Sequence, residues 1–194
     1  MCGKCCGIAS RQMSPIDTDP KTKEMKNMTI HEGARLAGSI RQKLGEMDRL
    51  CKGLSEETAS DAPEGRWSPK QIISHLCGPE GVGHLPALRL ILEQDTPLID
   101  LKAEDPFFTG RRTNMSMPDL LAEFRKEYLQ IAELVAGLSG EQLVRKAHIP
   151  MLKETGLGEY PTLAKFIGGL IDYHMDFHIK HMQEILQSLG VKQS

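Results

Sequence analysis

Apolar residues recur along much of the chain at alternating intervals of three and four, with polar residues between them. This period places the apolar residues on one face of an α-helix. It predicts helices over residues 29–54, 69–94, 116–138 and 162–189, separated by polar stretches that contain Gly and Pro. Four amphipathic helices of this kind predict an all-α fold, a four-helix bundle. The irregular stretch 98–115 is long enough to form a crossover connection after the second helix.

The second helix has a strong start signal. Ser68 can cap the helix, Pro69 suits its first position, and Gln71 completes a capping box. Trp67, just outside the cap, is expected to pack onto Ile72. The sequence therefore predicts that this helix begins at Pro69.

The middle of the second helix is weaker. Residues 78–86 contain several Gly and Pro residues, and Pro79 cannot donate a hydrogen bond to the carbonyl of His75. We therefore expect the helix to kink or widen near His75, with the helical pattern resuming over residues 87–94.

The last helix carries histidine where a bundle helix would normally carry leucine. It is expected to begin at a Thr162 cap and to end before Gly190. Its predicted inward stripe consists of Leu163, Ile167, Leu170, His174, His178, His181, Ile185 and Leu189. Buried imidazoles need polar partners, and one metal ion can serve several imidazoles at once. A hydrogen-bonded polar core, or exposed imidazoles, would explain the same pattern without a metal.

The spacing limits which histidines can bind the same ion. His174 and His178 lie one turn apart and can ligate one ion together. His181 is seven residues from His174, roughly 10 Å along the axis, so all three cannot easily do so. A third ligand must then come from another helix, where His75 is the best candidate and His84 the next.

Composition gives one domain and few indications of partners. The chain has 194 residues, of which 1–27 lack periodicity and are expected to form a flexible N-terminal extension before a helical domain at 28–194. The net charge of -2 gives no basic surface for nucleic acid. No apolar run reaches about 18 residues, so no membrane span is expected. No secretory signal is visible either.

The five cysteines indicate a reducing compartment. Cys51 and Cys77 fall within helical patterns and are expected to be buried thiols, which suits the cytoplasm. Cys2, Cys5 and Cys6 lie in the extension, where no second cysteine pair or nearby histidine completes a metal site. This cluster is either a loose metal or redox handle or simply part of a flexible terminus.

Two segments resemble the motifs of the DinB-like (DNA-damage-inducible, YfiT-like) superfamily of metalloenzyme-type four-helix bundles. Residues Trp67 to Leu76 (WSPKQIISHL) resemble its first motif, and residues His174 to Met182 (HMDFHIKHM) resemble its second. Residues Tyr160 to Leu163 (YPTL) fit the start of the family's last helix. The resemblance covers about residues 29–190, but the Gly and Pro residues of 78–86 depart from the family's unbroken helix.

The resemblance implies three metal ligands, His75, His174 and His178, with His181 outside the coordination sphere. Three neutral imidazoles suit Zn²⁺ or Ni²⁺ and leave positions open for water or substrate. Asp172, Asp176 and Glu80 are candidates to orient the ligating rings, although each also fits an ordinary surface position.

The family resemblance implies a metal-dependent enzyme acting on a small molecule. It implies two chemistries that use the same three ligands, so the sequence does not separate them. The leading hypothesis is a transferase that activates a low-molecular-weight thiol, and the alternative is a metal-dependent hydrolase. A third hypothesis is a non-catalytic, metal-stabilised bundle that binds a ligand. The resemblance also implies a homodimer.

Overall fold

The computed structural model describes the backbone of residues 20–102 and 104–191, and the side chains from residue 32 onward within these ranges. The cysteine cluster of the N-terminus lies outside the described residues. The first helix begins at Pro20, earlier than the predicted Thr29, and ends at Cys51. The flexible character of the extension stays a prediction.

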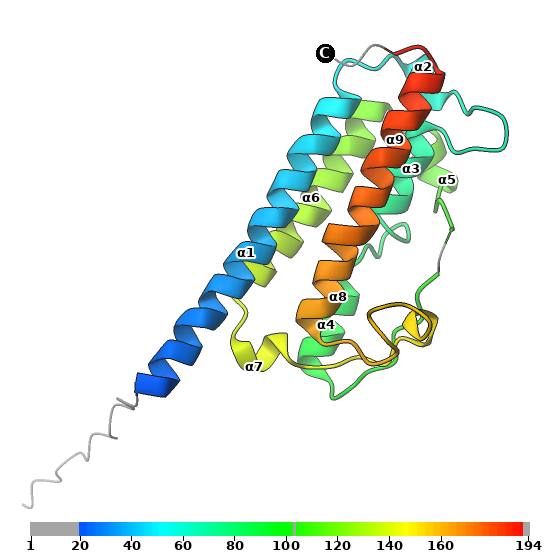
Figure 1. Ribbon diagram of the computed structural model, residues 1–194. Coiled ribbons are helices and arrows are strands. Elements are labelled where there is room, and N and C mark those ends of the chain that lie inside the picture. The colour runs from blue at the N-terminus through cyan, green and yellow to red at the C-terminus, as the bar shows by residue number, and fades with distance from the viewer. Residues whose placement is uncertain (1–19, 103, 192–194) are drawn as a thin grey trace, which may run out of the picture.

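The chain forms the predicted four-helix bundle (Figure 1). Its α-helices are α1 (Pro20–Cys51), α2 (Glu56–Ser60), α3 (Pro69–Leu76), α4 (Leu85–Glu93), α5 (Gly110–Thr113), α6 (Met117–Ala136), α7 (Gly140–Leu143), α8 (Leu163–Gly168) and α9 (Asp176–Ser188). A short 3-10 turn, η1, spans Pro150–Leu152, and a π-helical segment, η2, spans Gly169–Met175. Helices α1 and α6 run side by side, α8, η2 and α9 form one continuous column, and α3 with α4 completes the bundle (Figure 1).

Side-chain caps begin the helices where the sequence predicted them. Ser68 accepts a hydrogen bond from the backbone N–H of Gln71, and the Gln71 side chain accepts one from the N–H of Ser68 in return. Ser116 at the start of α6 and Thr162 at the start of α8 each accept one hydrogen bond from a backbone N–H of the first turn. At the other end of the column, Gly190 has a positive φ of 74° directly after the last residue of the helix cap, as predicted.

The second predicted helix ends near His75 instead of kinking. Helix α3 stops at Leu76, and Gly78 follows with a φ of 72°, a left-handed conformation that ends a helix and that glycine adopts without strain. The helical path resumes at Leu85. The expected kink was therefore wrong, because glycine at this position favours termination over distortion.

The last helix contains a widened turn that the sequence analysis did not predict. The fully buried residues of this column are spaced by four throughout its middle, at Ile167, Ile171 and Met175. Leu170, which was expected to face inward, is only half-buried. The π-helical turns of η2 account for the change from the predicted inward positions. Their i→i+5 bonds make each residue advance less around the axis than in an α-helix, which keeps residues spaced by four closer to one face.

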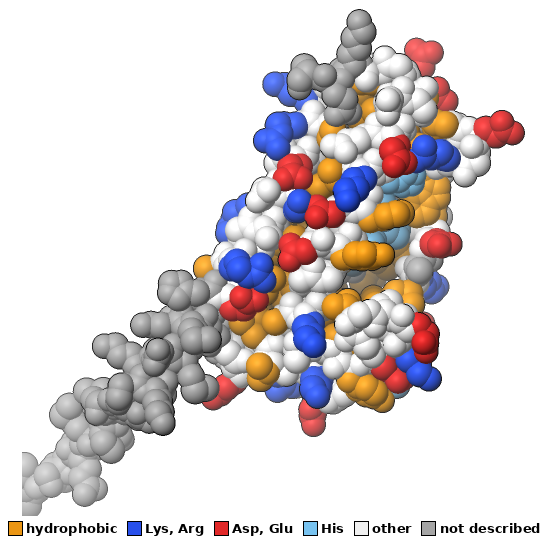
Figure 2. Space-filling view, viewed as in Figure 1, with side chains coloured by type: hydrophobic (Ala, Val, Ile, Leu, Met, Phe, Trp, Pro, Cys, Tyr) orange, Lys and Arg blue, Asp and Glu red, His pale blue; other side chains and the backbone are white. Residues whose placement is uncertain are grey.

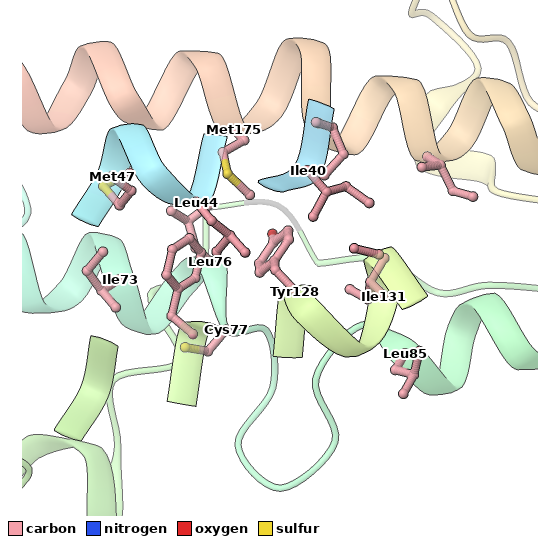
Figure 3. Close-up of a cluster of buried hydrophobic side chains, with 14 of the residues drawn as sticks. Ile40, Leu44, Met47, Ile73, Leu76, Cys77, Leu85, Tyr128, Ile131 and Met175 are labelled. Atoms are coloured by element: carbon pink, nitrogen blue, oxygen red, sulfur yellow. The ribbon is translucent and has the colours of Figure 1, made fainter. Parts of the chain in front are cut away.

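The bundle core is built from the inner faces of α1, α3, α6 and this column. Figure 3 shows Ile40 and Leu44 of α1 close to Tyr128 and Ile131 of α6, with Met175 from the C-terminal column beside them. All five are buried, and the four on α1 and α6 lie on the apolar faces that the sequence period predicts for these helices. The core thus holds the C-terminal column against the other helices at the level of η2.

The widened turn can be tested by truncating two neighbouring side chains. Ile171→Ala is expected to lower the free energy of unfolding by about 2–5 kcal/mol, because it leaves a cavity in the core. Leu170→Ala removes a half-buried side chain of the same size and should cost about 1 kcal/mol or less. Urea denaturation of the two variants would measure both values. A larger loss for Leu170→Ala would contradict the π-helical register.

Candidate metal centre

Three histidines from two distant parts of the chain meet inside the bundle. His75 lies in the last turn of α3, His174 lies in η2, and His178 lies in the first turn of α9. One ring nitrogen from each of them falls within 4.8 Å of those of the other two. His75 and His178 are buried and His174 is half-buried. The fold therefore brings together the three histidines that the family resemblance singled out.

The ring of His75 is held by the connection between α4 and α6. Its Nδ1 lies 2.7 Å from the backbone carbonyl of Asp105 and donates a hydrogen bond to it, since a carbonyl can only accept. This bond leaves Nε2 without a proton and free to ligate. That nitrogen lies 2.8 Å from Nε2 of His174. The ring of Phe107 stacks on His75 at 6.0 Å between centroids.

The connection is anchored to α3 by a buried arginine, Arg112, which sequence reasoning missed. Its guanidinium donates hydrogen bonds to the carbonyls of Ser74 (3.1 Å) and Gly78 (2.6 Å) at the end of α3. The side chain of Ser74 donates to the carbonyl of Phe107 at 2.9 Å. Glu123 of α6 accepts from Arg112 at 2.7 Å and 3.0 Å, so the buried charge is paired. Helix-end carbonyls need such donors.

Two residues close to Asp105 have strained backbone conformations. Glu104 and Phe107 have φ values of 58° and 47°, a region that residues other than glycine rarely adopt. Such strain persists only where the surroundings impose it. Here the surroundings include the hydrogen bond from Ser74 to the carbonyl of Phe107 and the bond from the N–H of Phe107 to the side chain of Asp105. The strained backbone presents the carbonyl of Asp105 to His75.

Burial keeps the three imidazoles neutral. Burial lowers the pKa of His75. Burial, together with repulsion from a neighbouring imidazole if that one is protonated, lowers the pKa of His174 to about 3 and that of His178 to about 2. Neutral imidazole is the form that ligates a metal ion. The three rings are therefore in the correct protonation state at neutral pH.

The group fits a divalent metal ion. Ligand nitrogens lie about 2.0–2.1 Å from zinc, so two of them on one ion are up to about 4 Å apart. The observed separations need only small adjustments to meet this range. Nδ1 of His174 and Nδ1 of His178 are buried and have no hydrogen-bond partner among the described residues. The three-histidine group could hold a metal, and the assignment of these particular ligands stays a prediction.

The other two histidine candidates lie outside the group. The ring of His181 is 5.9 Å from that of His178, as expected for a residue beyond the ligands, and its Nδ1 has no partner among the described residues. Nε2 of His84 lies 3.0 Å from the carbonyl of Leu76 and donates to it. The backbone N–H of His84 donates to Glu127 at 2.6 Å. His84 thus closes the gap between α3 and α4.

The three carboxylates expected to orient the rings have other roles. Asp176 pairs with Lys43 of α1 at 2.5 Å, and Glu80 accepts from Arg111 at 3.0 Å. Asp172 is exposed. The backbone carbonyl of Asp105 orients His75 in their place. Because every residue has such a carbonyl, the sequence does not mark this one.

Trp67 packs on the histidines rather than serving only as a staple for α3. Its ring is stacked on His178 with an interplanar angle of 3° and 6.0 Å between centroids. It also lies 5.0 Å from the ring of His75 and 6.1 Å from that of His181. An aromatic residue at this position closes one side of the group.

These features define a class of protein: a four-helix bundle that carries three neutral histidines capable of holding a metal. YfiT from Bacillus subtilis, a probable metal-dependent hydrolase with an unusual four-helix bundle topology, has a similar solved structure. The TM-score is 0.68 and the sequence identity is 18%, over 93% of this chain and 95% of that chain. At this identity the likeness shows a shared four-helix bundle fold. No protein-family model matches the chain, and no match is found among curated proteins.

The anchoring role of Arg112 can be tested against its neighbour in sequence. Arg112→Met should lower the free energy of unfolding by about 3 kcal/mol, because it leaves two carbonyls at the end of α3 without their donor and removes the buried partner of Glu123. It should also weaken metal binding, since the carbonyl of Asp105 loses its anchor. Arg111→Met is the matched control, because Arg111 also pairs with Glu123 but is exposed. Equal losses in urea denaturation would contradict the role of Arg112.

The buried imidazoles also predict how stability depends on pH in the metal-free protein. In the unfolded chain they titrate near pH 6.5, whereas in the folded chain their pKa values are lowered. Between about pH 6.5 and 3 the unfolded state binds more protons, so the free energy of unfolding should fall as the pH falls. His174→Leu should show a shallower dependence in urea denaturation from about pH 7.5 to 5. The same slope in both proteins would show that His174 does not contribute.

Proposed function

We propose that the protein is a metal-dependent hydrolase that acts on a small molecule. The observation that carries this proposal is the meeting of three neutral imidazoles from α3, η2 and α9, two buried and one half-buried, with ligand atoms within 4.8 Å. Three histidine ligands leave positions open for water or substrate, which is the arrangement of catalytic rather than structural zinc sites. The likeness to YfiT, itself a probable metal-dependent hydrolase, supports the same chemistry. Zn²⁺ or Ni²⁺ suits an all-imidazole set.

Each residue of the group has a defined task in this proposal. When bound, the ion lowers the pKa of a water or thiol that it holds and polarises a carbonyl. His75 is kept in one tautomer by the carbonyl of Asp105, so that Nε2 remains available. Trp67 covers one side of the rings and excludes water there. His181, whose ring lies 5.9 Å from that of His178, is the residue that we assign to accept a proton from the attacking water.

A second candidate is the transfer of a low-molecular-weight thiol to an electrophile. One observation favours it: among the described residues, the ligand group contains imidazoles and no carboxylate that could act as a general base. A thiol held by a metal ion loses its proton without needing a strong base. This chemistry would use His75, His174 and His178 in the same roles and would not require His181.

The cell compartment and the oligomeric state are proposals as well. Among the described helices, none combines the length and apolar composition that a bilayer crossing requires. We propose a cytoplasmic location, because Cys51 and Cys77 are buried free thiols. A homodimer also remains a proposal.

The three functions can be separated by measuring metal content and turnover of the same preparation. Zinc-loaded protein is tested with a nitrophenyl ester, and then with a thiol plus a chloronitroarene. Metal-dependent ester hydrolysis supports the hydrolase, and metal-dependent thiol conjugation supports the transferase. Bound metal without either reaction supports a non-catalytic bundle. Protein that binds no metal would remove the basis of both enzyme hypotheses.

Two histidine variants test the assigned roles. His178→Ala should abolish stoichiometric zinc binding, because it removes a ligand, whereas His181→Ala should retain the metal. In a hydrolase, His181→Ala should also lower the turnover number by about 10²–10⁴-fold. Elemental analysis and steady-state kinetics on both variants check this. Equal loss of zinc in the two variants would refute the ligand assignment.

A further inference from the structure

Large aromatic side chains lie exposed next to the histidine group. Tyr173 is 77% exposed and Phe177 is 57% exposed, although both belong to the column that supplies His174 and His178. Exposed aromatic residues that gather beside a site are typical of ligand contacts. Figure 2 shows hydrophobic side chains and histidine side chains together at the surface on this face of the molecule.

Helical spacing explains why these aromatic residues flank the ligands. Residues 173, 177 and 181 follow one another at intervals of four and form one row along the column. Residues 174 and 178 form the adjacent row. The Phe177 ring meets His178 edge-on at 5.0 Å and lies 6.0 Å from the ring of His181. Phe177 therefore borders the side of the group that is open to solvent.

Two further rings from other segments border the same histidines. Trp67, before α3, stacks on His178, and Phe107, between α4 and α5, stacks on His75. Both are half-buried. Together with Phe177 they surround the histidine group with aromatic rings from three separate segments.

Four charged groups near the site form two ion pairs. Arg66 pairs with Glu184 of α9 at 2.8 Å, and Lys43 pairs with Asp176 at 2.5 Å. Each of these four charges is therefore paired with an opposite charge. Beside Phe177 and Trp67, the site therefore offers aromatic contacts, and these four residues supply no unpaired charge that would select an ionic ligand.

We propose that Phe177, with Tyr173 and Trp67, forms a wall that binds the aromatic part of an uncharged substrate beside the three histidines. This inference rests on the proposed metal-dependent function and names the class of substrate. The aromatic group of the substrate packs against Phe177, and its reacting group then lies toward His174 and His178. Ring contacts of this kind tighten binding by about two- to tenfold beyond the effect of the area that they bury.

The single tryptophan of the chain gives a direct assay. Trp67 is the only tryptophan of the chain. Because it stacks on His178, tryptophan fluorescence reports on this site. Zinc-loaded protein is titrated with benzohydroxamate and with acetohydroxamate, which share the same metal-binding group. We expect benzohydroxamate to bind about tenfold more tightly. In Phe177→Ala this preference should fall below about threefold with zinc content unchanged.

Leu129→Ala is the matched control, since Leu129 is an apolar residue of α6 that is 43% exposed. It should retain the full preference. Equal binding of the two hydroxamates by the parent protein, or an unchanged preference in Phe177→Ala, would overturn the inference. A dimer that dissociates in Phe177→Ala during sedimentation would also overturn it, by showing that this face binds a second copy of the chain.

The proposed function and this inference fail in different measurements. If the zinc-loaded protein hydrolyses no ester yet prefers benzohydroxamate through Phe177, the hydrolase proposal fails and the aromatic wall stands. If the protein binds no zinc, the metal-free form is titrated with benzyl alcohol and with propanol, and a preference for benzyl alcohol that Phe177→Ala removes supports the wall. No such preference overturns it.

Discussion

The widened turn of η2 is the constraint on which both the core and the histidine group depend. In a regular α-helix, each step of four residues advances about 40° beyond a full turn, so Ile167, Ile171 and Met175 would drift off the core face. The π-helical turns remove this drift and keep all three buried. His174 lies in the same turns, where its Nε2 is 2.8 Å from Nε2 of His75. Widened turns of this kind are frequent at functional sites.

The end of α3 is the second requirement, because it fixes the third histidine. Three carbonyls at this end accept hydrogen bonds from side chains elsewhere in the chain: those of Ser74 and Gly78 from Arg112, and that of Leu76 from His84. The Gly and Pro residues that follow α3 thus separate it from α4, and side-chain donors satisfy the carbonyls at the end of α3. The departure from an unbroken helix reshapes the rim of the site and leaves His75 in place.

How much of this could be predicted depends on whether the signal is local. Caps at Ser68, Ser116 and Thr162 follow from short-range hydrogen bonding, and the bundle follows from apolar periodicity, so both were confirmed. The meeting of His75 with the C-terminal helix came from the family resemblance and the lack of a third ligand on one helix. The widened turn was missed because the pattern was fitted to intervals of three and four, although a run at intervals of four was present.

Long-range partners left no comparable signal. The carbonyl of Asp105 belongs to the backbone, and nothing in the sequence marks which carbonyl a histidine will meet. Arg111 and Arg112 are adjacent and chemically identical, and only the packing decides that Arg112 turns inward. The carboxylates near the histidines in sequence were drawn instead to Lys43 and to Arg111, which are the nearest cations in the fold.

The electrostatic environment of His75 favours a cation despite the buried arginine nearby. The C-terminal end of a helix carries partial negative charge, and His75 lies in the last turn of α3. The charge of Arg112 would oppose a second cation there, but Glu123 and two carbonyls of the same helix end accept its hydrogen bonds. The arginine charge is thus neutralised where it sits, while the three neutral imidazoles add no repulsion of their own. A divalent ion at this position would meet oriented nitrogen lone pairs and no unpaired positive charge from these groups.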